Sequence, residues 1–361
     1  MRSRKASNRK KPAGSTRWLS GLALLAAIGL AARYERPERA TRSAGKDRAA
    51  ALDGQSPLDI PARGWREIAW RVYEGINRDR LLAVAASVVF YGLLALFPAI
   101  TAFVSLYALF LDPSTIAAHL NVLKALMPEG AYQIVENQVT HIAQAGSGSL
   151  SWTFVAGLLF ALWSTNSGMK AMIDALNVTY GETEKRGFIE LNLVSLTMTL
   201  AGLAFMLLAI AGVVVAPLVL GWLGLAGRGE WAIALLRWPA IFLLIVLGLA
   251  ALYRFGPSRE AAHLKWFTVG AVVATLLWVA GSVLFSWYLS NFANYNATYG
   301  SLGAAIGLMM WLWLTSIAIL VGAEINAEIE HQTARDTTTG RARPLGTRGA
   351  AMADTVGAAQ H

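Results

Sequence analysis

The sequence predicts an all-α, polytopic membrane protein: a six-transmembrane-helix bundle with external amphipathic helices and disordered cytoplasmic tails. Three observations predict it: six long apolar runs, loops that alternate sharply in Lys and Arg content, and a composition with 55% hydrophobic but only 15% charged residues. A transmembrane helix needs roughly 20 mostly apolar residues. The expected spans are residues 81–111, 150–169, 192–223, 232–253, 266–289 and 302–321.

The loop charges predict how these spans are oriented, because basic loops are retained on the cytoplasmic side. In the loops after the first, third and fifth spans, the only Lys and Arg residues are Lys124 and Arg228. The approach to the first span, the other two loops and the tail carry most of the remaining Lys and Arg residues. We therefore expect both ends of the six-span core to be cytoplasmic.

The chain divides into a basic N-terminal extension over residues 1–60, a membrane domain over 61–331, and a tail over 332–361 that we expect to be disordered. Within the extension, residues 18–32 are apolar and would form a helix of about 22 Å. That length is short of the roughly 30 Å hydrocarbon core. A cleaved signal peptide, a seventh span and an interfacial helix all stay open for this segment.

The first external loop contains an amphipathic pattern. Large apolar residues recur at helical spacing from Ile116 to Ile142, and Pro128 interrupts the pattern. This predicts two short helices that lie on the outer membrane surface or pack against the external helix ends.

Polar residues inside apolar spans are costly in lipid, so they are the first candidates for function. Asn166, Lys170, Asp174 and Asn177 recur at intervals of three and four residues, which places them on one helix face. Lys170 and Asp174 are spaced to form an ion pair. The face predicts either a polar cavity open to the cytoplasm or the ordinary wet face of a helix that extends beyond the bilayer.

The end of the sixth span adds two further polar candidates, Glu324 and Asn326. Glu324 could cap the cavity, pair with Arg254 or Lys170, or mark the end of the helix. Elsewhere, Pro98 in the first span and Pro217 in the third predict kinks with freed carbonyl groups.

Small residues open the sixth span. Gly300, Gly303 and Gly307 repeat at near-helical spacing, and the last two form a GxxxG pair. Such residues let helix backbones approach closely in lipid. The pattern predicts helix packing, either within one subunit or between copies of the chain.

Several separate blocks resemble the YihY/BrkB family of bacterial inner-membrane proteins, once labelled ribonuclease BN. The likeness covers roughly residues 65–331 and includes Gly322-Ala-Glu-Ile-Asn326. The other blocks lie at residues 85–98, 162–168, 175–180, 252–257 and 299–303. The resemblance implies a six-helix core in the bacterial cytoplasmic (inner) membrane. It also implies a link to envelope biology or virulence, and for some members to lipid transport.

No residue cluster predicts catalysis. Metal-dependent RNA hydrolysis needs clustered ligands, whereas the five histidines are scattered, at positions 119, 141, 263, 331 and 361. Cysteine is absent, which excludes thiolate metal sites, and no Walker-type loop, HExxH or GxSxG motif occurs. We expect no enzyme activity, no cofactor or metal, and no nucleic-acid partner.

The expected function is therefore a transporter or lipid translocase of unknown substrate, with membrane lipids as its partners. The alternative is a membrane scaffold that does not transport and that assembles with itself or with envelope proteins. A polar cavity in contact with lipid would favour transport, and an exposed GxxxG face would favour the scaffold.

Overall fold

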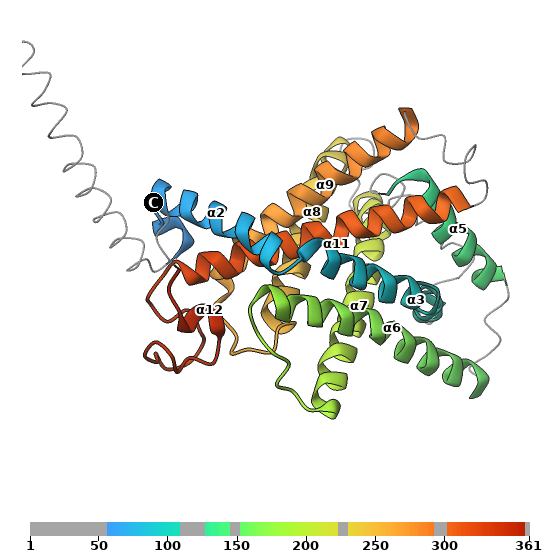
Figure 1. Ribbon diagram of the computed structural model, residues 1–361. Coiled ribbons are helices and arrows are strands. Elements are labelled where there is room, and N and C mark those ends of the chain that lie inside the picture. Colours follow the sequence, from blue (N-terminus) through green and yellow to red (C-terminus); the bar gives the residue numbers. More distant parts are fainter. Residues whose placement is uncertain (1–55, 109–126, 145–151, 223–229, 292–301, 358–361) are drawn as a thin grey trace, which may run out of the picture.

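The computed structural model describes residues 56–108, 127–144, 152–222, 230–291 and 302–357 (Figure 1). Within these ranges the chain is helical, and the only extended pairing is an isolated bridge between Ala262 and Thr338. The elements are η1 (Pro57–Asp59), α2 (Ala62–Arg78), α3 (Leu81–Ala108), α5 (Glu129–Gln144), α6 (Trp152–Thr179), α7 (Phe188–Trp222), α8 (Glu230–Phe255), η3 (Leu264–Trp266), α9 (Thr268–Asn291), α11 (Leu302–His331) and α12 (Ala351–Asp354).

Five helices in the described ranges are long and apolar enough to cross a membrane. They cover Leu81–Tyr107, Phe188–Ala209, Trp238–Phe255, Leu264–Asn291 and Gly303–His331. Helix α6 has 28 residues, but the run from Ser164 to Ser167 and then Lys170 lower its hydropathy. The predicted all-α membrane protein is confirmed, and a sixth span at α6 stays a prediction.

Helix α11 lies at the centre of the bundle (Figure 1). It packs against α2, α3, α5 and α9, while α3 lies along α6 and α7 lies between α6 and α8. The core under α11 is rich in small side chains, including Ala85, Ala175, Ala271 and Ala323. Small residues allow the close helix approach on which packing in lipid depends.

Helices α9 and α11 meet almost backbone to backbone. A Cβ atom added to Gly270 would lie 2.0 Å from the carbonyl oxygen of Gly322, so no side chain fits there. Asn326 closes the same contact, because its Oδ1 accepts the Gly270 N–H at 2.8 Å and its Nδ2 donates to the Phe267 carbonyl at 3.3 Å. The Asn326 side chain thus connects α11 to the start of α9 by hydrogen bonds.

Helix α5 is amphipathic, as the sequence predicts for this segment. Ala131 and Tyr132 are buried against the bundle, whereas Gln133 and Asn137 are exposed. Its placement outside the membrane stays a prediction, and residues 109–126, expected to hold a second such helix, lie outside the described ranges.

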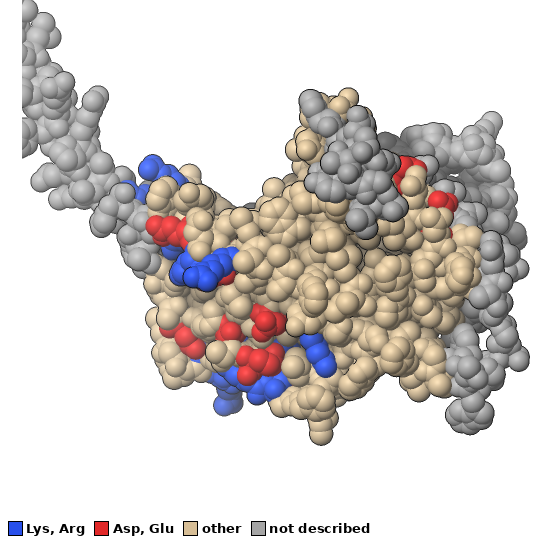
Figure 2. Space-filling view, turned by 45° about the vertical axis from the view of Figure 1, so that its right-hand side comes forward, with Lys and Arg blue, Asp and Glu red and all other residues tan. Residues whose placement is uncertain are grey.

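Charged side chains gather at one end of the bundle, which we call the charged end (Figure 2). It comprises helix α2, the α6–α7 loop at residues 180–187, the α8–α9 loop at residues 256–267, and the C-terminal segment at residues 332–357. The middle of the molecule in that view carries almost no charged side chains, and a few acidic side chains lie at the opposite end. Large apolar side chains such as Phe90, Phe160 and Trp163 are exposed between the two ends.

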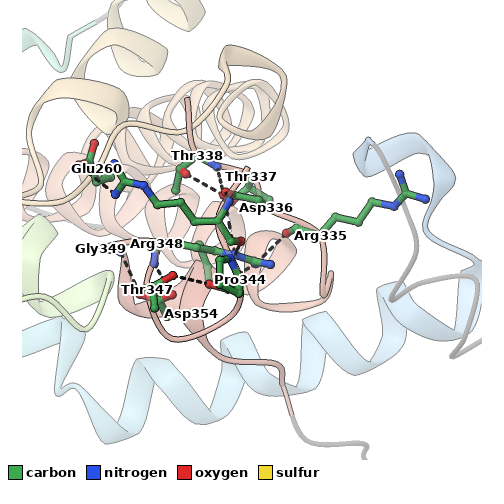
Figure 3. A network of polar contacts seen from close by, with 12 residues as sticks. Glu260, Arg335, Asp336, Thr337, Thr338, Pro344, Thr347, Arg348, Gly349 and Asp354 are labelled. Carbon is green, nitrogen blue, oxygen red and sulfur yellow. Dashed lines mark hydrogen bonds and ion pairs between the residues drawn. The ribbon is translucent and has the colours of Figure 1, made fainter. Parts of the chain in front are cut away.

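The expected disorder of the tail is wrong for residues 332–357. Arg348 is 4% exposed, and its guanidinium donates to the carbonyl groups of Ala334, Arg335, Arg343 and Ala353 (Figure 3). Three glycines in this segment have positive φ, at positions 340, 346 and 349, and this conformation permits tight turns. The glycine-rich composition therefore encodes turns around a buried arginine.

Several predictions concern residues that lie outside the ranges described by the structure. These are the extension over residues 1–55, with its apolar stretch 18–32, and Gly300; the side chain of Pro217 is also not described. Helix α3 runs unbroken through Pro98, and a kink there stays a prediction.

Candidate functional site

The polar face predicted on α6 separates into three environments. Asn166 is 2% exposed, and its Oδ1 has no hydrogen-bond partner among the described residues. Lys170 is half-buried and Asp174 is exposed. Asn177 is buried at the charged end of the helix. The structure does not join them with Glu324 and Asn326 in a single cavity: these two residues face α2 and α9.

Lys170 bridges α6 and α7. Its ammonium donates to Asn192 Oδ1 at 2.5 Å, and Asn192 Nδ2 donates to the Phe188 carbonyl at 2.7 Å. The ammonium also lies 5.5 Å from the ring centroid of Trp163 and 5.9 Å from that of Phe188. The expected ion pair with Asp174 does not occur among the described contacts, because the Lys170 side chain reaches α7.

These residues form a partly exposed polar strip, which we call the polar track: Ser167, Lys170 and Asp174 of α6 with Asn192 of α7. The three α6 residues follow one another at helical spacing on one face. Phe160 and Trp163 on the same side of α6 are 71% and 60% exposed. Polar groups thus run beside apolar groups that a membrane would cover.

Asn177 connects two loops at the charged end. Its Oδ1 accepts the Ser258 N–H at 2.7 Å, and its Nδ2 donates to Glu184 at 3.0 Å. Partial burial would raise the pKa of Glu184, but hydrogen bonds from Arg186, Asn177 and Ser258 outweigh this effect and lower it to about 2. Asn177 therefore anchors the two loops to the end of α6.

Glu324 is fully buried against α2. A Cβ atom on Gly75 would overlap its carboxylate, and neither carboxylate oxygen has a hydrogen-bond partner among the described residues. Its nearest cation is Arg78, whose Nη2 lies 3.9 Å from Oε1. The partners considered from the sequence, Arg254 and Lys170, are not found here, because α2 covers this face of α11.

Sequence reasoning missed a buried polar network between α2 and α11. Arg71 donates to Glu328 at 2.6 Å and to Gln332 at 2.5 Å, and Gln332 donates to Glu67 at 3.2 Å. The signal was present as spacing: Glu324 and Glu328 of α11 and Gln332, directly after its end, recur every four residues. Glu67 and Arg71 have the same spacing on α2.

Gly303 and Gly307 of the predicted packing motif face other helices of the same chain. Gly303 and Gly307 are buried, and a Cβ atom on Gly307 would lie 3.9 Å from Leu289 of α9. The neighbouring Ala304 packs against α5: a Cβ atom built on Gly130 of α5 would lie 3.5 Å from the Ala304 Cα atom. The motif therefore serves contacts within the subunit.

An apolar groove lies between α3 and α11, with a volume of about 430 Å³. Phe90, Met309, Met310 and Trp313 are among the residues that line it. Phe90 is 59% exposed. The groove is thus open on the surface that carries the apolar side chains.

The sequence of the helical core decides the family. Residues 72–345 match the family described as virulence factor BrkB. The chain belongs to this BrkB family. The matched region runs from the middle of helix α2 into the C-terminal segment and takes in the polar track. Glu67 and Arg71 of the buried network lie just before it.

The BrkB-family chain has curated relatives over most of its length. A ribonuclease-like protein of Bacillus subtilis, YfkH, is 35% identical over 264 residues, or 72% of this chain and 91% of YfkH. UPF0761 membrane proteins of Neisseria meningitidis serogroup B and Alkalilimnicola ehrlichii are 26% and 27% identical. Those matches cover 73% and 75% of this chain but 63% and 60% of the two relatives. The chain therefore spans less than two thirds of their length.

No solved structure matches this BrkB-family chain. Among its described residues, no group of three His, Cys, Asp or Glu side chains is placed to hold a metal ion.

Proposed function

We propose that this BrkB-family protein moves phospholipids passively between the leaflets of the bacterial inner membrane, with the charged end in the cytoplasm. The observation that carries the proposal is the polar track, and above all the Lys170–Asn192 contact on a surface flanked by exposed apolar side chains. Such a track lets a polar headgroup cross the hydrocarbon layer while the acyl chains stay in lipid.

The polar track extends deep enough into the membrane to help a headgroup cross it. A helix rises about 1.5 Å per residue, so Ser167 lies about 18 Å from the end of α6 at Thr179. The hydrocarbon core is about 30 Å thick. With Thr179 at the cytoplasmic boundary, the track reaches past the middle of the membrane.

The energetic cost of the track also argues for a use. A lysine near the centre of a membrane helix costs about 2.5 to 3.5 kcal/mol on insertion scales. Asn192 and the rings of Trp163 and Phe188 stabilise the Lys170 ammonium without removing it from the surface. A cation held in this way can bind a passing phosphate group.

The apolar groove between α3 and α11 fits the same function, because its volume and lining suit an acyl chain. The proposal contains no proton-coupled step. The buried Glu324 lies at the charged end, away from the track. Passive movement along a concentration difference needs only the polar surface.

The scaffold alternative has less support. It requires an exposed small-residue face, whereas Gly303 and Gly307 are buried within the subunit.

We also propose that the protein is not a ribonuclease, despite the name of its Bacillus relative. Incubation of the purified protein with labelled RNA and Mg²⁺ or Zn²⁺ tests this directly, and cleavage above a mock purification would refute it.

Reconstitution tests the main proposal. The full-length protein is incorporated into liposomes with a trace of fluorescent phospholipid, and dithionite then destroys the dye in the outer leaflet. We expect fluorescence loss to pass the outer-leaflet fraction with the wild type and to slow about tenfold in the Lys170→Met/Asn192→Leu variant. Arg341→Gln, an exposed charge change in the C-terminal segment, is the matched control and should behave as the wild type. Wild-type traces that match empty liposomes would overturn the proposal.

A further inference from the structure

A second pocket, of about 470 Å³, lies at the charged end. Its walls come from the α6–α7 loop, the start of α7, the end of α8 and the loop that follows α8, with Gly349 of the C-terminal segment at one side. Its volume lies within the range of small-molecule sites, about 300 to 1,000 Å³. Six charged side chains line it: Lys185, Arg186, Glu190, Arg254, Arg259 and Glu260.

Four of these six charges are already compensated. Arg186 pairs with Glu184 at 2.7 Å. Arg259 pairs with Glu330 at 2.5 Å, and Lys185 with Glu182 at 2.8 Å. Glu260 lies 3.5 Å from Arg343. These pairs build the walls of the pocket and leave no net charge for a ligand to neutralise.

The two remaining charges, Arg254 and Glu190, are opposite in sign. Arg254 occupies the last turn of α8, and its Nε is buried with no hydrogen-bond partner among the described residues. Glu190 occupies the first turn of α7 and is exposed. Neither forms an ion pair among the described contacts. Their positions suit the dipoles of their helices, but this does not satisfy the buried Nε.

Apolar surface borders the pocket on one side. Phe255 is part of the lining and is 55% exposed. Ile189, which precedes Glu190 at the start of α7, is 82% exposed. Aromatic and aliphatic side chains in such positions at the end of a membrane helix contact lipid. A ligand here has its polar part in the pocket and its apolar part outside it.

We propose that this pocket binds the headgroup of a phospholipid that carries both a phosphate and a primary ammonium, as ethanolamine phospholipids do. The phosphate accepts hydrogen bonds from the terminal amino groups of the Arg254 guanidinium, and the ammonium donates to Glu190. The acyl chains lie along Phe255 and the exposed start of α7. The negative phosphate and the positive ammonium of such a headgroup thus complement the charges of Arg254 and Glu190, which have no ion-pair partner among the described residues.

This inference goes beyond the proposed translocation and does not depend on it. Glu190 and Asn192 are two residues apart on α7, about 200° around the helix. The pocket therefore lies on the α8 side of α7 and the polar track on the α6 side. A lipid held in the pocket can anchor or regulate the protein whether or not lipids cross the membrane elsewhere.

Native mass spectrometry of the purified full-length protein tests the proposal. Phosphatidylethanolamine, phosphatidylglycerol and phosphatidylcholine with identical acyl chains are titrated separately. We expect the wild type to bind phosphatidylethanolamine at least about fivefold more tightly than the other two, and Arg254→Gln to weaken its binding by about five- to tenfold. Glu190→Gln should remove the preference for phosphatidylethanolamine and leave phosphatidylglycerol binding unchanged. Arg66→Gln, at an exposed position of α2, makes the same charge change outside the pocket and should bind as the wild type.

Equal affinities for the three lipids in the wild type, or an unchanged preference in Glu190→Gln, would overturn the proposal. Because Glu190 is exposed, that variant keeps the test valid even where Arg254→Gln fails to fold. Millimolar soluble phosphoethanolamine is the final arm: displacement of the lipid by it would assign the pocket to a soluble ligand. Lipid translocation is measured independently, so either idea can fail alone.

Discussion

The guanidinium of Arg259 binds both carboxylate oxygens of Glu330, at 2.5 and 2.7 Å, with both side chains only 1% exposed. Glu330 also accepts a hydrogen bond from Thr337, and Arg259 lies 5.2 Å from the ring centroid of Tyr180. One ion pair therefore connects the α8–α9 loop, the end of α11, the α6–α7 loop and the C-terminal segment.

Replacing one partner of this pair should be far more damaging than replacing both. Arg259→Met leaves the Glu330 carboxylate buried without its cation, and loss of one partner of a buried pair costs about 3 to 5 kcal/mol. The double variant Arg259→Met/Glu330→Leu should recover most of that loss. Thermal unfolding in detergent, followed by tryptophan fluorescence, measures both. Equal destabilisation by the single and double variants would contradict this account.

Acid should weaken the contact between the two loops through Glu184. The pKa of its carboxyl is about 2 in the folded protein, against 4.5 for an ordinary glutamate. A group whose pKa is lowered on folding stabilises above its unfolded pKa, and that stability disappears as the pH falls from about 4.5 to 2. Because Glu184 is partly exposed, the contribution is about 1 kcal/mol or less. Melting temperatures at pH 6 and pH 3 should differ less for Glu184→Gln than for the wild type, with Glu74→Gln, at an exposed position of α2, as the control.

The α9–α11 contact should not tolerate one extra methyl group. In Gly270→Ala the new Cβ would lie 2.0 Å from a backbone oxygen that no rotamer change can move. Overpacking of this kind costs typically about 1 to 3 kcal/mol. Gly281→Ala on the same helix meets nothing within 4 Å, and it should be neutral or stabilising. Purification yield and melting temperature distinguish them, and similar values for the two variants would show that the helices separate more easily than the contact implies.

Two glutamates one turn apart on α11 should respond in opposite ways to the same substitution. Glu324→Gln replaces a buried carboxyl group that has no hydrogen bond among the described residues, so stability should hold or rise. Glu328→Gln takes the charged partner from the buried Arg71, and the loss should be about 2 kcal/mol. Parallel melting curves compare the pair. A larger loss for Glu324→Gln would mean that its contact with Arg78 is stronger than 3.9 Å suggests.

Arg348 should decide whether the C-terminal segment stays folded on the charged end. Its guanidinium satisfies carbonyl groups from four residues, and Arg348→Ala leaves those groups unpaired. We expect limited trypsin digestion to cut the C-terminal segment at least about tenfold faster in this variant. Arg341→Ala, at an exposed position, removes a charge and a trypsin site without touching the network. Identical digestion rates in Arg348→Ala and the wild type would contradict the folded arrangement.

Much of the helical layout follows from hydropathy, because an apolar run of membrane length can only be a helix in lipid. The first span was expected over residues 81–111, and α3 covers Leu81–Ala108. The second was expected to end at residue 169, yet α6 continues to Thr179. Hydropathy detects the apolar part of a helix and not its polar continuation.

Contacts between helices were beyond the reach of one sequence. Spacing placed Asn166, Lys170 and Asn177 on one face of α6, but each has a different neighbour in space. Asn177 binds Ser258, 81 residues away, and no local pattern encodes that choice. Composition misled in the C-terminal segment, because glycine and polar residues fit both a disordered chain and a series of tight turns.

The Gly270–Gly322 contact also divides the molecule mechanically. Because the two backbones touch with no side chains between them, we expect α9 and α11 to resist sliding past one another. Helices α6 and α7, by contrast, meet near Lys170 through long side chains that can adjust while the helices shift. We therefore expect the α6–α7 seam to adjust more easily than the α9–α11 pair.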